Sequence, residues 1–328
     1  MTSRERFAEV LRFGRPDRMP YLWEDIREEV LAEWAKQGLK PGEDTAAWFP
    51  CDRVTQVPVD YGPRPGLERI PRTARELEEL KGRLNPDDPG RWPADWAKLA
   101  GEWRHRDHLL QLQLGWGFFL TMGVGDWAGF EEAVELLAEE PDLVREIMAI
   151  HGGFHARMAD RVLSVVDPDF ACLSEPLCSV YGPLISPRSY EEVVLASYRP
   201  VLETLRIRGV KTVVYMTFSN ARPLLPAVFR AGFNCLWAYE RAVAGMDYLA
   251  IRNEFGPSIR LIGGLDTDAI LAGGKAMRVE VESRVAELLG RGGYIPQADG
   301  RIRPNMPMKN YVEYRRVLDR TVGKGRKR

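Results

Sequence analysis

The stretch FNCLWAYERAVAGMDYLAIRNEFGPSIRLIGGLDTDAILAGGKAMRVEVESRVAELLGRGGYIPQAD, residues 233–299, decides the fold. Short runs rich in apolar, β-branched and aromatic residues (233–240, 259–266 and 293–299) alternate in it with longer amphipathic segments. Near-continuous apolar runs of this length are typical of parallel strands that helices cover on both faces. The stretch therefore predicts strand, helix, strand, helix, strand.

The same alternation extends toward the N-terminus. It predicts five further strands at RMPYLWED (18–25), RVTQVPVDY (53–61), LLQLQLGWGFFL (109–120), DFACLSE (169–175) and KTVVYMT (211–217). Eight strand–helix units in one undivided chain predict a single α/β domain over 1–328, a (β/α)8 TIM barrel with an N-terminal helical extension. Residues 62–108 contain six prolines and no clear strand pattern, so we expect an irregular insertion with short helices after the second strand. A doubly wound sheet is the alternative, but its GxGxxG fingerprint is absent after the first strand.

Four local signals refine the expected helices. In the apolar stripe over 131–166, Pro141 and the pair Gly152-Gly153 are expected to break or bend the helix. Further along, Ser189 is expected to cap the next helix and Gly209 to end it.

Composition excludes several classes of protein. The chain has 46 Lys and Arg against 47 Asp and Glu, a net charge of -1, which argues against a binder of duplex nucleic acid. No apolar run approaches the roughly 20 residues of a membrane helix, and the first residues lack the apolar core of a signal peptide. The four cysteines form no CxxC pair and predict free thiols in a reducing cytoplasm; they are Cys51, Cys172, Cys178 and Cys235.

Carboxylates mark six of the eight predicted strand ends: Glu24, Asp60, Glu175, Glu240, Asp266 and Asp299. Any one of them alone is more often a helix cap or turn residue. Several carboxylates around one barrel mouth repel each other, which raises some of their pKa values toward general-acid use. We predict acid or base roles for Glu175 and Glu240, with Asp266 and Asp299 in support.

Aromatic residues follow the same pattern of strand ends. A single aromatic on a barrel strand usually belongs to the packing, but a mouth rimmed by several favours a flat, apolar substrate. Asn220 and Tyr181 are the expected hydrogen-bond donors to that substrate. The predicted substrate-binding residues are Trp23, Glu24, Asp60, Trp116, Tyr181, Tyr215, Asn220 and Trp237.

The histidines and cysteines do not predict a metal site. His151 and His155 are spaced i,i+4, but no Glu completes an HExxH pattern, and a solvated helix face is the expectation. His105 and His108 lie in the charged stretch EWRHRDH, where we expect surface residues. Cys172 and Cys235 are expected to be buried, and one further thiol at Cys178 does not make a zinc site.

The second half of the chain resembles the uroporphyrinogen decarboxylase superfamily. The resemblance rests on YGPLISPRSYEEVVLASYRPVLETLRIRGVK (181–211), LLPAVFRAGFNCLWAYERAVAGMD (224–247), RLIGGLDTDAI (260–270) and GGYIPQADGRIRPNMPMKNYVEY (292–314). The opening MTSRERFAEVLRFGRPDRMP is also similar to the usual start of the bacterial decarboxylase-like members. The resemblance implies a (β/α)8 barrel with its site in the mouth. It also implies one of two chemistries, either cofactor-free decarboxylation of porphyrinogen acetate groups or methyl transfer to or from a corrinoid, usually with zinc.

This chain departs from the sequence patterns of both chemistries, and these departures narrow the choice of activity. The Arg-rich substrate clamp is replaced by YLWEDIREE, and the histidine motif near the last strand is replaced by Ala298-Asp299-Gly300, which argues against porphyrinogen decarboxylation. Where the zinc methyltransferases carry an HxC pair, this chain reads Tyr215-Met216-Thr217, and no Cys follows the last strand. The resemblance therefore does not extend to a zinc-activated thiol. The DGN-like turn of a third, decarboxylase-like group reads Phe218-Ser219-Asn220 here.

These observations leave three hypotheses. The first is a cytoplasmic, corrinoid-linked methyltransferase or demethylase acting on a small aromatic or apolar substrate, without tightly bound zinc. Its methylcobamide would be presented by a separate corrinoid protein, and a homodimer is expected from the superfamily. The second is a decarboxylase or other lyase on a non-porphyrin carboxylate, and the third is a non-catalytic barrel that binds a ligand.

Overall fold

The computed structural model describes residues 1–22, 24, 26–40, 51–240 and 245–325. Contacts between Cα atoms divide the chain into two compact units, each described here by itself. The first unit comprises Met1–Val54, Asp107–Leu109 and Cys235–Arg328, and the second comprises Thr55–Arg106 and Leu110–Asn234. The single domain over 1–328 stays a prediction.

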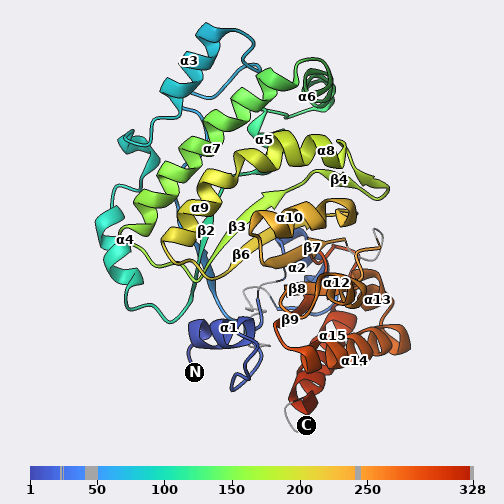
Figure 1. The fold of residues 1–328 in the computed structure, drawn as a ribbon. Helices are drawn as coiled ribbons and strands as arrows, with labels where there is room; N and C mark the ends of the chain where they lie inside the picture. The colour runs from blue at the N-terminus through green and yellow to red at the C-terminus, as the bar shows by residue number, and fades with distance from the viewer. Residues whose placement is uncertain (23, 25, 41–50, 241–244, 326–328) are drawn as a thin grey trace. The chain divides into compact units, whose positions relative to one another are not determined.

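The second unit contains parallel strands whose helices follow them in sequence (Figure 1). Its strand order is β1-β2-β3-β6, with β2, β3 and β6 parallel and Cys172 opposite Val214 in the register. The elements are β1 (Val54–Gln56), α3 (Ala74–Arg83), η2 (Pro89–Arg91), α4 (Trp96–Trp103), β2 (Leu109–Gln113), α5 (Gly117–Thr121), α6 (Trp127–Glu139), α7 (Pro141–Leu163), β3 (Phe170–Glu175), β4 (Cys178–Ser179), β5 (Gly182–Pro183), α8 (Pro187–Ser189), η3 (Tyr190–Leu195, π-helical), α9 (Arg199–Ile207), β6 (Val213–Phe218), η4 (Arg222–Leu224) and α10 (Leu225–Ala231).

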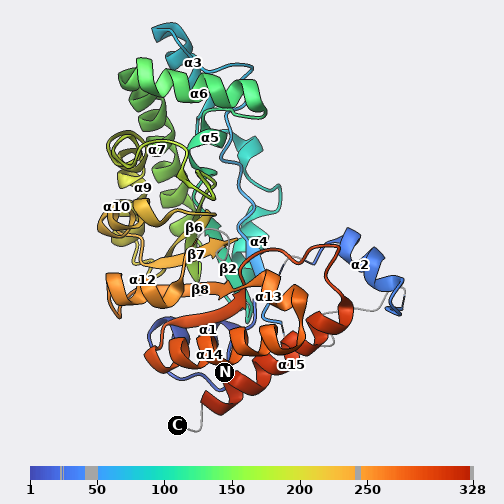
Figure 2. The same ribbon diagram turned by 90° about the vertical axis from the view of Figure 1, so that its right-hand side faces the viewer.

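The first unit contains the stretch with which the sequence analysis began. Strands β7 (Cys235–Tyr239), β8 (Arg260–Leu265) and β9 (Tyr294–Ala298) are parallel neighbours, with Trp237 opposite Ile262 and Ile262 opposite Ile295. Helices α14 (Gly274–Arg291) and α15 (Met308–Gly325) run side by side in this unit (Figure 2). Its remaining helices are α1 (Ser3–Leu11), α2 (Glu28–Ala35), α12 (Tyr248–Phe255) and α13 (Thr267–Ala272).

The predicted α/β class is confirmed, and so are seven of the eight predicted strand positions, at β1, β2, β3, β6, β7, β8 and β9. The closed eight-stranded barrel stays a prediction. The short helices expected within 62–108 are present as α3, η2 and α4. No helix in the part of the chain that the structure describes is both long and apolar enough to cross a membrane.

One strand prediction was wrong, and one was correct only in its first half. In 18–25 the described residues form no strand, because the Tyr21 amide donates to the Asp52 carboxylate at 2.9 Å instead of to a neighbouring strand. In 109–120 the strand ends at Gln113, and the second half forms the short helix α5. The reversal occurs at Gly115 and Gly117, whose φ angles of 128° and 77° lie in the region that favours glycine.

The helix signals had mixed outcomes. Pro141 begins α7 as predicted, and α9 ends just before Gly209, which has φ 79°. Gly152 does not break α7; a Cβ atom there would lie 1.9 Å from the Ser197 carbonyl oxygen, so glycine permits close packing against the segment before α9. The predicted cap at Ser189 was also wrong, because Ser186 caps α8 by accepting from the Ser189 amide.

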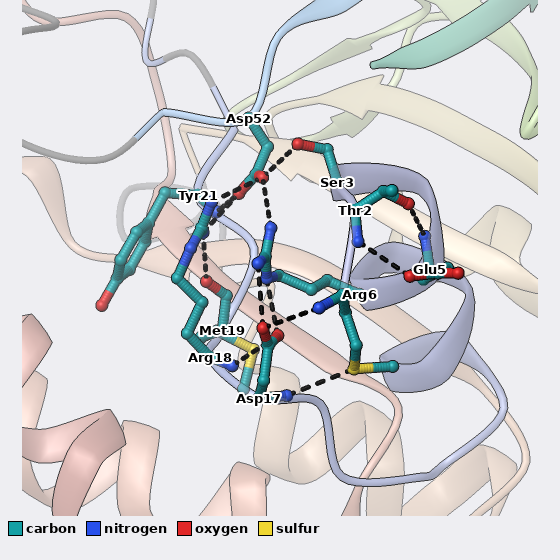
Figure 3. Close-up of polar contacts among 10 residues, drawn as sticks. Thr2, Ser3, Glu5, Arg6, Asp17, Arg18, Met19, Tyr21 and Asp52 are labelled. Carbon is teal, nitrogen blue, oxygen red and sulfur yellow. Dashed lines mark hydrogen bonds and ion pairs between the residues drawn. The ribbon is translucent and has the colours of Figure 1, made fainter. Parts of the chain in front are cut away.

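A buried carboxylate anchors the N-terminal segment of the first unit (Figure 3). Asp52 accepts two hydrogen bonds from Arg18, at 2.7 and 2.8 Å, and one from the Ser3 hydroxyl at 2.5 Å. With the Tyr21 amide, these donors satisfy a carboxylate that is almost completely buried. The contact joins α1 to the chain on either side of α2.

Candidate functional site

The three predicted carboxylates of the first unit meet at one edge of its sheet. Glu240, Asp266 and Asp299 directly follow the parallel strands β7, β8 and β9. The Glu240 amide donates to the Asp299 carbonyl oxygen at 2.5 Å, and the Asp299 amide donates to the Leu265 carbonyl oxygen at 2.7 Å. The backbone therefore brings these residues together, as the positions of the strand ends predicted.

Their side chains have different environments. Asp299 is buried, and its Oδ1 accepts from the Thr267 amide at 3.1 Å and hydroxyl at 2.7 Å. Asp266 caps α13 by accepting from the Asp268 amide at 2.8 Å. Glu240 is exposed, with a φ of 57° that is unusual for a residue other than glycine. Such backbone strain is found preferentially at functional sites.

Trp237 supplies a buried hydrogen-bond donor near this edge. Its ring stacks on that of Tyr239, two residues along the same strand, with centroids 5.8 Å apart. Among the described residues, no acceptor lies within hydrogen-bond distance of its Nε1. Its predicted contact with substrate stays a prediction.

Glu24 is buried within the first unit and has four hydrogen-bond partners. Its Oε1 accepts from the Tyr314 hydroxyl at 2.6 Å and the Ala298 amide at 2.9 Å. Its Oε2 accepts from the Tyr311 hydroxyl at 3.0 Å and from Arg315 at 3.3 Å. These contacts are typical of a structural ion pair. The contact of Glu24 with substrate stays a prediction. Trp23 lies outside the described residues.

Glu175, at the end of β3 in the second unit, is a fully buried carboxyl group with 0% exposure. Its Oε1 accepts from the Phe118 amide at 2.8 Å, and its Oε2 accepts from the Tyr198 hydroxyl at 2.7 Å. Gly117 makes this approach possible, since a Cβ atom at that position would lie within 3 Å of both Glu175 and the Ser174 carbonyl oxygen. The turn before α5 therefore packs directly on the carboxyl group.

Burial raises the pKa of Glu175 to about 7, although the hydrogen bonds from Tyr198 and the Phe118 amide oppose that rise. Desolvation disfavours the charged form of an acid, and no Lys or Arg whose position the structure describes contributes to this pKa. A carboxyl group with a pKa near the working pH is populated in both protonation states. It is therefore suited to giving or taking a proton at neutral pH.

Buried hydroxyl and thiol groups surround Glu175. The Tyr190 hydroxyl donates to the Tyr215 hydroxyl at 3.1 Å, and Tyr215 lies next to the end of β3 in the register. Burial raises the pKa of Cys178 to about 12; the Glu175 charge adds to the rise and the Thr217 hydroxyl opposes it. All these groups are neutral near pH 7, so the surroundings do not compensate a charge on Glu175.

The other predicted substrate contacts of the second unit are spread over several environments. Tyr215 is fully buried, while Trp116 and Tyr181 are 49% and 95% exposed. Asp60 forms an ion pair with Arg64 at 3.0 Å. Asn220 follows β6, and its amide donates to the Ser179 carbonyl oxygen at 3.1 Å. Contact of these four with substrate stays a prediction.

The prediction of a solvated face for His151 and His155 was wrong. Both are buried on α7, and burial lowers the pKa of His151 to about 4 and that of His155 to about 3. The His155 ring lies beneath Gly115, where a Cβ atom would come within 2.8 Å of it, and edge-on to Tyr61. Their i,i+4 spacing places both on the face that packs inward.

Sequence reasoning missed Tyr190 and Tyr198. The block SYEEVVLASYRP could have indicated them. A buried carboxyl group at a strand end needs hydrogen-bond donors, and this block places two tyrosines in the helical segment that follows Glu175. The π-helical segment η3 begins at Tyr190 and ends at Leu195, before Tyr198, and π-helical turns are frequent at functional sites.

Zinc does not fit the donor groups. Over the ranges that the structure describes, no three His, Cys, Asp or Glu side chains gather closely enough to hold a metal ion. At the position of the HxC pair in zinc-dependent relatives, Tyr215 holds a hydrogen bond with Tyr190 instead. We therefore derive no chemical step through zinc.

The comparisons with known proteins agree on one family. The profile described as "Uroporphyrinogen decarboxylase (URO-D)" matches residues 119–318. A uroporphyrinogen decarboxylase from Geobacter metallireducens is 25% identical over 294 residues, which cover 83% of this chain and 78% of that protein. The solved structure of a methyltransferase from Methanosarcina mazei aligns over 99% of both chains, with a TM-score of 0.55 and 15% identity. At that identity the likeness shows a shared fold.

Proposed function

Because the chain belongs to the uroporphyrinogen decarboxylase (URO-D) family, we propose that it is an enzyme of the family's methyltransferase branch. It moves a methyl group between a small aromatic or apolar substrate and a corrinoid that a separate protein carries. The likeness in fold to a solved methyltransferase supports this choice, and so does the replacement of the Arg-rich substrate clamp by Leu22-Trp23-Glu24 and its neighbours.

The observation that carries the proposal is the buried Glu175 carboxyl group, with a pKa of about 7 and no contribution from a cation among the described residues. When a methyl group leaves an oxygen or nitrogen atom, that atom gains negative charge and needs a proton. Protonated Glu175 donates it, and the resulting carboxylate takes a proton back in the reverse direction.

The corrinoid, when bound to its partner protein, supplies or accepts the methyl group. This chain's own residues hold the substrate and manage the proton. Trp116 and Tyr181 are large, exposed side chains beside the strand ends of the second unit, and they suit contact with an apolar substrate or with the partner.

Replacing Glu175 with Gln tests the proposal. The amide keeps the shape of the side chain but cannot deliver the acidic proton, so methyl transfer should fall about 10²–10⁴-fold. The assay mixes the protein with free cob(I)alamin and a panel of methylated phenols and amines, and follows methylcobalamin by its absorbance.

The matched control is Glu192→Gln, which removes an exposed carboxylate paired with Arg188 and should leave turnover unchanged. At or below about pH 4.5, where Glu175 stays protonated in the folded protein, the thermal transition of Glu175→Gln should stay close to that of the parent. Turnover in Glu175→Gln equal to that of the parent would exclude Glu175 as the proton donor.

A decarboxylase acting on a non-porphyrin carboxylate is the second candidate, supported by the 25% identical decarboxylase. In that reaction the same Glu175 proton would go to the carbanion left by departing carbon dioxide. The two candidates differ in product. Carbon dioxide released from a panel of aromatic carboxylates without any corrinoid would favour this second activity.

A further inference from the structure

Tyr198 is the side-chain donor to Glu175, and it lies where helix α9 begins. The phenol hydroxyl donates to Oε2 at 2.7 Å, and the ring is buried at the N-cap position of that helix. On the opposite side, the Phe118 amide donates to Oε1 at 2.8 Å. Each carboxyl oxygen therefore has one donor, and the two donors come from different segments of the second unit.

The two donors differ in what they can do. A backbone amide has one hydrogen that it only donates, so Oε1 is the oxygen that stays unprotonated in both states. A phenol both donates and accepts, so Oε2 carries the proton when Glu175 is neutral and accepts from Tyr198 when it is charged. The protonation change of Glu175 therefore takes place at the oxygen that Tyr198 contacts.

The remaining titratable groups around Glu175 are Tyr190, Tyr215 and Cys178. Tyr190 uses its hydroxyl on Tyr215, and burial keeps all three groups protonated. Over the described residues no cation contributes, and the hydrogen bond from Tyr198 is the largest influence that favours the charged form of Glu175.

We propose that Tyr198 is a positioning residue, which holds the Glu175 carboxyl group in one orientation and sets the pH at which its proton is released. The proposal deepens the proposed function, and it rests on that function only for its effect on turnover. Tyr198 acts through Glu175 in this role and is assigned no contact with substrate.

The test is a titration of Glu175 in the full-length protein without substrate. The carbonyl stretch of the protonated carboxyl group is followed by infrared difference spectroscopy and assigned by its loss in Glu175→Gln. In Tyr198→Phe both forms lose the contact with the phenol, but the hydrogen bond to the charged form is the stronger one, so the titration midpoint should rise by about 1–2 pH units. Incorporation of 3-fluorotyrosine at position 198 makes the phenol a stronger donor and should lower the midpoint.

The matched control is Tyr190→Phe, which removes a buried hydroxyl from the same helical region without touching Glu175. Its midpoint should equal that of the parent. An unshifted midpoint in both position-198 variants, or an equal shift in Tyr190→Phe, would overturn the proposal. The fluorotyrosine protein keeps this test valid if Tyr198→Phe does not fold.

The dependence of turnover on pH distinguishes a failure of this proposal from a failure of the proposed function. If Glu175 is the proton donor, the alkaline limb of the turnover–pH profile should move with the infrared midpoint in each variant. A midpoint that moves while the profile does not would support the role of Tyr198 and reject Glu175 as the acid. A midpoint that stays fixed rejects the role of Tyr198 whatever the activity.

Discussion

Glu175 in the second unit and Glu24 in the first are buried glutamates with similar hydrogen-bond partners and different charged neighbours. Each accepts from one backbone amide; Glu175 also accepts from one tyrosine hydroxyl and Glu24 from two, at distances of 2.6–3.0 Å. Glu24 also contacts Arg315, whereas no Lys or Arg in the described part of the chain contributes to the pKa of Glu175. A buried carboxylate beside a cation is an ion pair that holds segments together, and one without a cation is an acid with a raised pKa.

The ion pair also affects its basic member. Burial lowers the pKa of Arg315, but the charge of Glu24 and its neighbours Tyr311 and Tyr314 together raise it by more, so the net direction is upward. Asp52 repeats this arrangement elsewhere in the first unit, with Arg18 as its cation. Among the described residues, a cation partner, rather than burial alone, therefore distinguishes Glu24 and Asp52 from Glu175.

The largest expected effect on stability follows from removing the charge of Glu24. Glu24→Gln removes the charged group that buried Arg315 contacts at 3.3 Å, so the free energy of unfolding should fall by about 3–5 kcal/mol. Urea denaturation monitored by tryptophan fluorescence measures the change. The double variant Glu24→Gln, Arg315→Met should recover part of the loss, because it also removes the cation that the Glu24 charge stabilised. A loss below about 1 kcal/mol would contradict the structural assignment of Glu24.

The second prediction concerns how Glu175 makes the free energy of unfolding depend on pH. Its pKa is about 7 in the folded protein, against about 4.5 when unfolded. As the pH rises from about 4.5 to 7, the unfolded state loses this proton first, so folding becomes less favourable by up to about 3 kcal/mol. Glu175→Gln should lack this dependence, and the difference between parent and variant unfolding curves at several pH values measures it.

Comparing parent with variant is necessary because the buried histidines act in the opposite direction. His151 and His155 have pKa values of about 4 and 3 when folded, so they destabilise the protein as the pH falls below about 6.5. Both proteins share these histidines, and the difference cancels their effect. A difference that does not change across pH 4.5–7 would mean that the pKa of Glu175 is not raised.

The smallest of the three effects is expected at Asp52. Asp52→Asn weakens the double contact with Arg18, but Arg18 is 31% exposed and water can replace part of the lost interaction. The free energy of unfolding at pH 7 should fall by about 2 kcal/mol, less than for Glu24→Gln.

The pH dependence of Asp52 has the opposite sign to that of Glu175. Burial raises the pKa of Asp52, but hydrogen bonds from Arg18, Ser3 and the Tyr21 amide lower it more. Its stabilising effect is therefore present above the unfolded pKa of about 3.8 and is lost as the pH falls. Acid titration of stability in the parent and Asp52→Asn measures this, and an equal loss in acid for both proteins would contradict it.

Much of the fold could be predicted from local pattern. Apolar runs between turn residues located seven strands, because a strand covered on both faces must be apolar along its length. The strand expected at 18–25 failed because a carboxylate 31 positions away takes the Tyr21 amide, which no local pattern reveals. The buried histidines were missed for a similar reason, since i,i+4 spacing places two residues on one helix face without saying which face packs inward.

The candidate site could be predicted in position but not in chemistry. Carboxylates at strand ends identified Glu175, Glu240, Asp266 and Asp299, and the parallel strands of the first unit bring three of them to one edge. The same pattern did not distinguish Glu24 from Glu175, because both lie in or after apolar runs. It also gave no role to Tyr198, whose hydroxyl meets Glu175 only after β3 and α9 pack together.

The sequence by itself determined where the strands form and which carboxyl groups stand at their ends, since both depend on residues that are close along the chain. Tertiary structure decided whether such a carboxyl group forms an ion pair or retains its proton. Arg315 reaches Glu24 from 291 residues away and makes it an ion pair. From the residues that the structure describes, Glu175 receives a phenol and a backbone amide and no opposite charge to offset desolvation, so its proton is retained to a pH near neutrality.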